Sequence, residues 1–403
     1  MSEAAAPPEP SRDTLDEVVE TRRHLHRNPE VSFEERETST FIRDRLRSLG
    51  LDLRECPTET GAVAWLDTGR PGRTVMVRAD IDALPIQEDM ALPFESRHDG
   101  RMHACGHDAH TAIALGVARD LSERAEDLSG RFLFVFQPAE EIVQGAKAMI
   151  AKGLLEQNPA DYVVGLHTWA PMESGTVVAK PGVHWAGTDA FEIGFRGPGG
   201  HGAVMRRKGN VVGAQAFLVE RLYSIVDGLE HDGAGCHTAI GEVRSDGTYN
   251  VVPRNALLRG SVRTFTPALR EEALQRLHDL LLETETEFEV EARLDLKHSS
   301  TPLVNDARVT ELVMETARGL IGEKASRLGR PLTVGDDIAE FMVHIPGCYF
   351  MLGCLPPSRA GDPPIHHSPT FEIDENAFQV GVRVLAASAA RLAAEGVPAE
   401  AAG

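Results

Sequence analysis

Apolar positions in the first part of the chain follow two different periods. Segments with apolar residues at helical spacing alternate with short, nearly continuous apolar runs such as 74–77, the pattern of a central strand covered on both faces. The predicted helices span residues 11–30, 37–51 and 111–128, and the predicted strands lie at 74–77 and within 131–141 and 161–169. Because strands alternate with helices, this part is predicted to form an α/β sheet.

The pattern changes near residue 185, where apolar and polar residues begin to alternate. Strands within 189–197, 235–247, 255–265 and 289–298 and helices at 210–229 and 268–288 follow the order β-α-β-β-α-β. This order is the ferredoxin-like pattern with half-buried antiparallel strands. Further on, the α/β pattern returns with a helix at 306–322, a strand at 348–353 and a final Ala-rich helix.

These patterns predict two domains, one inserted into the other. A chain of 403 residues is also too long for one compact core. The predicted bounds are residues 12–184 and 299–395 for the α/β domain, 185–298 for the inserted α+β domain, and 1–11 and 396–403 for disordered tails.

Composition narrows the class of partner. Lys and Arg number 41 against 61 Asp and Glu, so the net charge is −20, which argues against binding to nucleic acid. No apolar run is long enough to span a bilayer, and the first residues do not resemble a signal peptide. The five cysteines are few, odd in number and without CxxC spacing, which fits a reducing compartment. We therefore predict a cytoplasmic protein with no nucleic-acid or membrane partner.

The stretch "MHACGHDAH", residues 102–110, gathers a thiol, imidazoles and a carboxylate. Cys105 and His107 lie just before a predicted helix that begins near Ala109, and Asp108 is predicted to cap that helix. The helix dipole would favour a thiolate at Cys105. Taken alone, an isolated Cys is more often a small buried hydrophobe. His103 and His110, in the same stretch, are assigned no role.

Further polar groups come just after predicted strands. Glu140 and Glu141 follow one strand and His167 follows the next, while His366 and His367 lie in a Pro-rich loop near the end of the chain. In open α/β sheets, function lies at the carboxyl ends of the strands, so these groups are expected to meet. Adjacent carboxylates repel each other, and a cation would relieve this.

Together with Cys105 and His107, these groups predict a metal site. Thiolate, imidazole and carboxylate suit Zn, Mn, Co or Ni, not Ca or Mg. One thiolate, three imidazoles and one of the two carboxylates make five ligands, which exceed one tetrahedral site, so two ions about 3.5–4 Å apart are expected, as in two-metal hydrolases. One carboxylate is then left as a general base.

Other classes of protein fit less well. "GPGGHG", at 197–202, fits a dinucleotide-binding G-x-G-x-x-G, but its surroundings are antiparallel and Pro198 lies inside the turn. A Cys105 nucleophile leaves the later His and Glu residues unexplained. A zinc deaminase would need PCxxC, which is missing. A binding module that has lost catalysis is disfavoured because Glu140 is present.

The motifs together resemble the M20 metallopeptidase family, in the amidohydrolase branch that includes hippurate hydrolases, N-acyl-amino-acid amidohydrolases and indole-acetyl-amino-acid hydrolases. The resemblance covers nearly the whole chain, in the right order. Its motifs are "RRHLHRNPEVSFEE", "VRADIDALPI", "MHACGHDAHT", "FQPAEE", "GLHTWAP", "GGHGA", "NVVPRNALLRGSVRTF" and "HHSPTFEIDENAF".

The resemblance implies a fold and a cofactor. The fold is an exopeptidase-like catalytic domain, with a mostly parallel sheet and helices on both faces, plus an inserted lid and dimerisation domain that makes a homodimer. The cofactor is a pair of divalent ions per subunit, Mn or Zn, with Co or Ni as alternatives. The implied ligands are Cys105, His107, Glu141, His167 and His367.

The resemblance also assigns roles in catalysis. Glu140 is implied as the general base, Asp82 as the residue that orients a metal ligand, and His201 as the group that reaches the partner subunit's site to stabilise the oxyanion. Asn250 and Arg263 are implied to contact the substrate's carboxylate and the tetrahedral intermediate.

The implied activity is hydrolysis of N-acyl amino acids or similar amide conjugates. A dipeptidase or aminopeptidase of the same family, or an M20 protein acting on a specialised amide, is the alternative. Some residues depart from the family pattern, namely Met205, Arg206, Asn210 and Val211 in the lid loop and Asp336 in "GDDIAEF", where a Glu is usual. We expect these changes to alter selectivity rather than to abolish catalysis.

Overall fold

The computed structural model describes residues 9–226, 228–231 and 234–397, and it divides into two units. The first unit comprises the described residues up to Gly182, Val304–Gly329 and the residues from Glu340 onward. The second comprises Val183–Leu303 and Arg330–Ala339. The boundaries expected at 184/185 and 298/299 stay a proposal, and the tails expected to be disordered lie largely outside the described residues.

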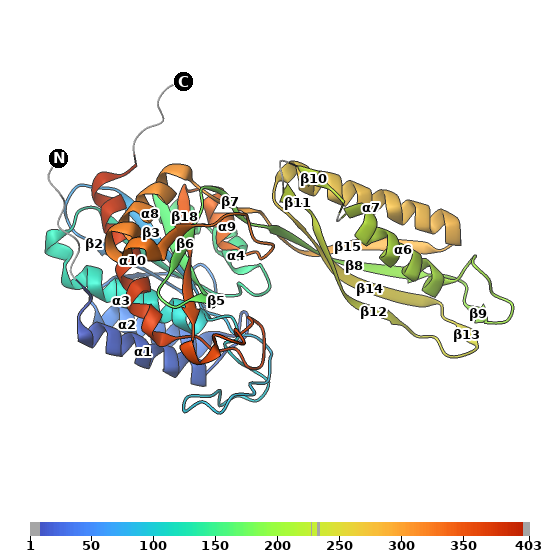
Figure 1. Cartoon of the computed structure of the whole chain (residues 1–403), viewed down its shortest axis with the longest axis horizontal. Coiled ribbons are helices and arrows are strands. Elements are labelled where there is room, and N and C mark those ends of the chain that lie inside the picture. The colour runs from blue at the N-terminus through green and yellow to red at the C-terminus, as the bar shows by residue number, and fades with distance from the viewer. Residues whose placement is uncertain (1–8, 227, 232–233, 398–403) are drawn as a thin grey trace, which may run out of the picture. The chain divides into compact units, whose positions relative to one another are not determined.

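An eight-stranded sheet forms the centre of the first unit (Figure 1). Its order is β1-β2-β4-β3-β5-β18-β6-β17, formed by β1 (Asp52–Arg54), β2 (Ala62–Asp67), β3 (Thr74–Asp80), β4 (Arg131–Gln137), β5 (Tyr162–Glu173), β6 (Val177–Ala179), β17 (Ala325–Arg327) and β18 (Gly347–Leu355). The helices of this unit are α1 (Arg12–Arg27), α2 (Arg36–Ser48), α3 (His107–Glu123), α4 (Gly145–Ala151), α5 (Leu154–Gln157), α8 (Ala307–Ile321) and α10 (Phe378–Glu395).

Shorter elements complete the chain between and beside these. The 3₁₀ helices lie at Ala125–Asp127, Gly322–Lys324, Pro357–Arg359 and Glu375–Ala377. The chain passes between the units four times: at β7 (Gly182–Trp185), at β16 (Leu303–Asn305), between Gly329 and Arg330, and within α9 (Ile338–Met342).

The middle of the sheet is parallel, as the sequence predicts. Strand β3 pairs in parallel with β4 and with β5, and β5 pairs in parallel with β18, whereas β2 and β6 pair antiparallel with their neighbours β4 and β18. Val75 and Val77 of β3 belong to the main hydrophobic core, and Met76, which points to the other face, is also fully buried. The strand is therefore covered on both faces, which confirms the expectation from its continuous apolar run.

Helix α10 is a long and apolar helix of the first unit. Its stretch Glu375–Glu395 is long and apolar enough to cross a bilayer, but 67% of its most apolar window is buried inside the protein. It packs against α3, α8 and β5. Its apolar character is thus explained by its place in the core.

The second unit is a four-stranded antiparallel sheet of order β12-β14-β8-β15 with two helices on one face (Figure 1). Alternate residues of β8, such as Phe191 and Ile193, pack with the helices in one hydrophobic core. The elements follow the predicted β-α-β-β-α-β order, with small additional strands: β8 (Gly187–Arg196), β9 (Gly200–His201), α6 (Val211–Val226), β10 (Glu230–His231), β11 (Ala234–Gly235), β12 (His237–Ser245), β13 (Val251–Val252), β14 (Asn255–Thr264), α7 (Pro267–Phe288) and β15 (Glu291–Ser300).

Residues 330–339 join the second unit although they are distant in sequence. The backbone N–H of Ala186 donates to the carbonyl oxygens of Leu332 (3.0 Å) and Val334 (2.9 Å), and Leu332 N donates to His184 O (3.0 Å). No apolar periodicity marks this segment, so the sequence pattern did not assign it to the inserted domain.

Candidate metal centre

The loop before α3 brings Cys105 and His107 to the carboxyl-end edge of the sheet. Gly106 precedes the helix with φ +95°, a conformation that favours glycine, and a Cβ there would lie 2.3 Å from Thr168 Oγ1. Cys105 Sγ lies 3.6 Å from His167 Nε2. Glycine is therefore required for the loop to pack this closely against β5. His167 itself lies inside β5, which continues to Glu173, beyond the predicted strand end.

The carboxylate of Glu141 joins the same group of side chains. Glu141 Oε1 lies 3.8 Å from His107 Nε2, and Glu141 Oε2 lies 3.4 Å from His367 Nε2. Glu140 Oε2 also lies 3.8 Å from His107 Nε2. The five ligands expected from the sequence, together with Glu140, are thus brought together in one place in the first unit, although they come from segments about 260 residues apart.

Two buried atoms in this group lack a hydrogen-bond partner among the described residues, His107 Nε2 and Glu141 Oε1. They face each other, and such orphaned polar atoms are costly unless something else satisfies them. The donor atoms of Cys105, His107 and His167 lie within 4.8 Å of one another, and so do those of Cys105, Glu141 and His367. Since these two sets differ in all but Cys105, the residues fit two cations better than one.

The charges of the site also favour cations. Burial, helped by the negative charge of Glu141, raises the pKa of Cys105 well above its usual value. Burial likewise raises the pKa of Glu141 to about 8. Burial opposes the charged form of His107, but Asp80 and Cys105 outweigh it and hold the pKa of His107 well above its usual value. Without a cation the site thus retains protons, and a divalent ion would replace them.

Asp82, just beyond β3, is hydrogen-bonded both to His107 and to the loop that carries Glu140 and Glu141. His107 Nδ1 donates to the carbonyl oxygen of Asp82 (2.9 Å) and lies 3.3 Å from its Oδ1, which leaves Nε2 free to face the site. The carboxylate of Asp82 also accepts the backbone N–H groups of Glu140 and Glu141, each at 3.0 Å, and the hydroxyl of Ser32 at 2.7 Å. Asp82 therefore orients one expected ligand and the backbone that carries two acids.

Asp80 and His110 form a second buried pair that the sequence reasoning missed. His110 Nδ1 donates to Asp80 Oδ1 (2.6 Å), while His110 Nε2 accepts the backbone N–H of Thr168 (2.9 Å). Asp80 Oδ2 lies 2.6 Å from Arg78 Nη1. Asp80 is the last residue of β3, at the carboxyl end of a parallel strand, and this position is the signal that could have found it.

Asp108 does not cap α3, contrary to the prediction. The cap position is Gly106, the helix begins at His107, and no side chain accepts a hydrogen bond there. The Asp108 carboxylate instead turns toward α1, where its Oδ2 lies 2.9 Å from Arg22 Nε and accepts from His26 Nδ1 at 2.7 Å. Buried Arg22 competes for the carboxylate, which a pattern of local capping residues cannot reveal.

His366 differs from its neighbour His367. His366 Nε2 accepts the backbone N–H of Ala170 (3.2 Å) and its Nδ1 lies 3.9 Å from Cys105 Sγ, so both ring nitrogens are engaged. Burial, and then the charge of His367, lowers the pKa of His366 to about 3. His367 adopts φ +64°, its backbone N–H donates to Ala104 O (2.8 Å), and its Nε2 is directed toward Glu141.

The remaining expected residues, His201, Asn250 and Arg263, lie in the second unit. His201 and Asn250 are neighbours, whereas Arg263 lies apart from them. His201 pairs with Val251 across β9 and β13, and Gly202 N donates to Asn250 O (2.8 Å), so His201 and Asn250 lie side by side. Arg263 lies at the other end of β14, about 30 Å along an extended strand. Its Nη1 donates to Thr333 O (2.9 Å), and burial lowers its pKa.

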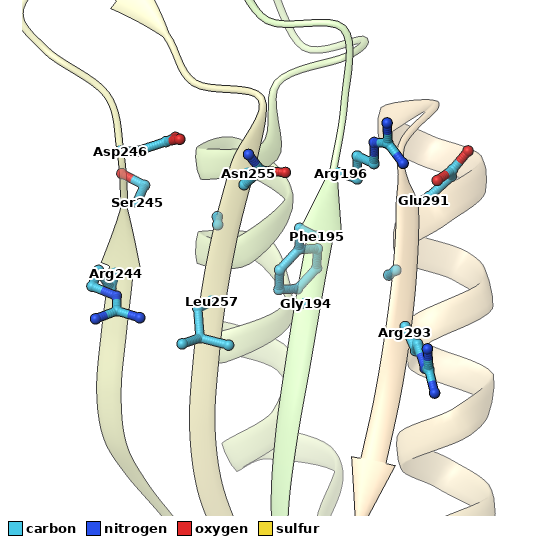
Figure 2. A pocket seen from close by; sticks show the side chains of 12 residues that line it. Gly194, Phe195, Arg196, Arg244, Ser245, Asp246, Asn255, Leu257, Glu291 and Arg293 are labelled. Carbon is cyan, nitrogen blue, oxygen red and sulfur yellow. The ribbon is translucent and has the colours of Figure 1, made fainter.

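A separate groove of about 770 Å³ lies on the open face of the four-stranded sheet (Figure 2). All four strands line it, with Arg196, Arg244 and Arg293 beside Asn255 and Glu291. The described residues that line it include no Cys or His. The groove therefore offers none of the soft metal donors found in the first unit.

The first unit has a mostly parallel sheet, and at its edge lie clustered thiol, imidazole and carboxylate groups. Together with the inserted antiparallel unit, these features are those of a dinuclear metal hydrolase. The sequence matches peptidase family M20/M25/M40 over residues 76–391. The chain therefore belongs to this family, and it is a metal-dependent hydrolase of amide bonds.

Relatives agree with this assignment. The chain is 35% identical over 376 residues to N-acetyl-L-cysteine deacetylase of Bacillus subtilis. The matched region covers 93% of this chain and 88% of that protein. It is 39% identical over 261 residues to N-acyl-L-amino acid amidohydrolase of Geobacillus stearothermophilus, covering 64% of this chain and 70% of that protein. Among solved structures, YxeP of Bacillus subtilis, a dinuclear metal binding peptidase, is 29% identical with a TM-score of 0.79 and covers 95% of this chain and 99% of that one.

Proposed function

We propose that the protein hydrolyses the amide bond of N-acyl amino acids, or of similar amide conjugates, to release an amino acid. The observation that carries this proposal is the juxtaposition of the five-residue donor set with a further carboxylate, Glu140, whose Oε2 lies 3.8 Å from His107 Nε2. The relatives named for N-acyl-amino-acid and N-acetylcysteine substrates support this substrate class.

Two divalent cations would be held by Cys105, His107, Glu141, His167 and His367. The thiolate and imidazole donors favour Mn or Zn, with Co or Ni as alternatives, over Ca or Mg. When bound, the ions would supply Lewis acidity and lower the pKa of water to near 7. The orphaned atoms of His107 and Glu141 support this assignment, because a cation would satisfy both.

Glu140 is proposed as the general base and then the general acid. Its side chain is 10% exposed, so it can meet a water molecule and substrate while its backbone is fixed by Asp82. Glu140 would accept a proton from the attacking water and return it to the leaving amine. Because Glu140 gives this proton to the leaving nitrogen, the amino acid departs as a neutral amine when the C–N bond breaks.

Groups of the second unit are proposed to act on the substrate. His201 would stabilise the negative charge that develops on the amide oxygen in the site of the partner subunit. Asn250, which lies beside His201, would contact the substrate or the tetrahedral intermediate in the same site. Arg263 would hold the substrate's carboxylate, because a guanidinium matches a carboxylate with two parallel hydrogen bonds. This arrangement requires a homodimer formed through the second unit.

We further propose that the protein works in the cytoplasm, without a nucleic-acid or membrane partner. All five cysteines are free, including the buried Cys348 and Cys354, as expected in a reducing compartment. The net charge of −20 disfavours binding to phosphate backbones.

The proposal is tested with a panel of N-acetyl, N-benzoyl and indole-acetyl amino acids and dipeptides, assayed after loading with Mn, Zn, Co or Ni. We expect release of the amino acid from at least one N-acyl substrate, with dipeptides poorer. Glu140→Gln should lower kcat about 10²–10⁴-fold while binding metal as the native protein does. Cleavage by Glu140→Gln at the native rate would refute the mechanism.

A further inference from the structure

The loop that carries Glu140 and Glu141 is held by a buried carboxylate that has no assigned role, that of Glu35. Glu35 lies directly before α2 and is fully buried. Its Oε1 accepts the backbone N–H of Ala139 at 2.8 Å. The next two N–H groups along the loop, those of Glu140 and Glu141, are accepted by Asp82. Three consecutive N–H groups are therefore bound by two buried carboxylates.

Ala139 is the residue of this loop that most needs an external partner. It adopts φ +53°, in the left-handed region that residues other than glycine rarely occupy. Its N–H is buried, and a buried N–H without an acceptor is strongly disfavoured. The carbonyl oxygen of Ala139 accepts from Gln144 N (3.3 Å) and Gly145 N (3.1 Å), which closes the loop. Glu35 thus fixes the peptide plane from which Glu140 and Glu141 begin.

The loop that carries Glu140 and Glu141 is tightly packed against itself. A Cβ on Gly145 would lie 1.6 Å from the carbonyl oxygen of Pro138, so the two arms of the loop are in direct contact. A loop this tight can change the direction of its acidic side chains through rotation of the Pro138–Ala139 peptide. That rotation would break the hydrogen bond to Glu35.

We propose that Glu35 is a positioning residue for hydrolysis, which holds Glu140 and Glu141 in register with His107 by accepting the N–H of Ala139. This rests on the proposed function, because it assumes that Glu140 is the base and Glu141 a metal ligand. Glu35 touches neither substrate nor metal. Its effect on the reaction is transmitted through one peptide group.

The role needs an acceptor atom and not a charge. Burial, and then the negative charge of Asp82, raises the pKa of Glu35 to about 7, so a neutral carboxyl is common near neutral pH. The carbonyl oxygen of a neutral carboxyl still accepts a hydrogen bond. Glutamine has the same length and the same carbonyl acceptor, so Glu35→Gln should preserve the function.

The test compares Glu35→Met, which fills the same space without an acceptor, with Glu35→Gln. The matched control is Glu30→Met, because the Glu30 carboxylate accepts the N–H groups of Glu37 (3.2 Å) and Thr38 (2.8 Å) in the same helix but does not contact the loop. Steady-state kinetics on the Mn-loaded enzyme, Mn²⁺ titration by calorimetry and hydrogen exchange of residues 138–141 are measured for each. If Glu35→Met did not fold, Glu35→Ala would replace it.

We expect Glu35→Met to lower kcat about tenfold or more with KM within about threefold, to weaken Mn²⁺ binding and to speed exchange at 138–141. Glu35→Gln and Glu30→Met should stay within about threefold of the native kcat. Native kcat and exchange in Glu35→Met, or equal loss in Glu35→Gln, would overturn the proposal. If the native protein bound Mn²⁺ but cleaved no amide, the proposed function would fail, and the exchange and titration data would still decide the role of Glu35.

Discussion

His107 and Asp82 are joined twice, through the carbonyl oxygen of Asp82 at 2.9 Å and through its carboxylate at 3.3 Å from the same Nδ1. The same carboxylate holds the backbone of Glu140 and Glu141. One side chain two residues beyond β3 therefore sets the positions of an imidazole from α3 and of two acids that follow β4. Loss of this carboxylate would affect both halves of the donor set at once.

We predict that Asp82→Ala weakens Mn²⁺ or Zn²⁺ binding about 10–100-fold, because His107 and Glu141 lose their common partner. Calorimetric titration of the metal-free protein measures this. Asp362→Ala, at a carboxylate that is 91% exposed, is the control and should bind metal as the native protein does. Unchanged affinity in Asp82→Ala would show that the hydrogen bonds of Asp82 do not position the ligands.

Asp80→Asn is predicted to destabilise the protein by about 3 kcal/mol, because Arg78 is fully buried and would lose its carboxylate. Arg78 would keep neutral partners such as Gln137 (2.9 Å). Arg54 and Asp52 form a pair with the same spacing along an exposed strand, with side chains 53% and 61% exposed. Asp52→Asn should therefore cost about 0–1 kcal/mol. Urea unfolding measures the free energy of unfolding of both variants. Similar decreases in Asp80→Asn and Asp52→Asn would contradict the prediction.

The metal-free protein should become less stable, relative to Glu141→Gln, as pH rises from about 4.5 to about 8. In this window the folded Glu141 carboxyl retains a proton that the unfolded chain has released, so the folded state binds more protons and loses stability as pH increases. Thermal unfolding in EDTA between pH 5 and pH 8 measures the difference. A difference that does not change with pH would refute the prediction.

Metal binding should reverse this trend. Deprotonation of Glu141 and Cys105 is required before they bind a cation, so Mn²⁺ should release protons and bind more tightly as pH rises toward 8. Calorimetry in buffers of different ionisation enthalpy counts the protons released. Release of no proton at pH 7 would mean that neither group is a ligand.

A mixture of two inactive variants tests the role of His201 in the partner's site. In a heterodimer of His201→Ala and Glu140→Gln, one site would combine an intact Glu140 with His201 supplied by the other subunit. Co-refolded subunits should therefore recover about a quarter of the native activity, since half of the dimers would each carry one complete site. If His201 acts within its own subunit, mixing recovers nothing.

Much of the fold follows from the sequence because the apolar patterns are unambiguous. The run at 74–77 predicts a strand buried on both faces, and the alternation in β8 predicts an antiparallel sheet with one covered face. The segment 330–339 escaped prediction, because backbone hydrogen bonds such as Ala186 N to Leu332 O attach it and leave no periodic signature.

The candidate site was predictable where residues follow strand ends, and less so where partners come from distant helices. Glu140 and Glu141 are found by their position after β4. Asp108 was assigned to a local cap because the pattern around it is local, whereas its partner Arg22 is buried in α1. The dependence of Ala139 on Glu35 could not be foreseen, since the left-handed backbone that creates it is known only from the folded chain.

The four passages of the chain between its two units have a practical consequence for dissecting the enzyme. Replacing residues 185–298 with a short linker would leave 330–339 without Ala186, whose N–H holds Leu332 and Val334, and without Arg263, which binds Thr333. Residues 330–339 would then expose backbone N–H and C=O groups that have lost their hydrogen-bond partners. A minimal catalytic unit therefore needs two excisions, and a single deletion at the obvious insertion is expected to yield an aggregation-prone protein.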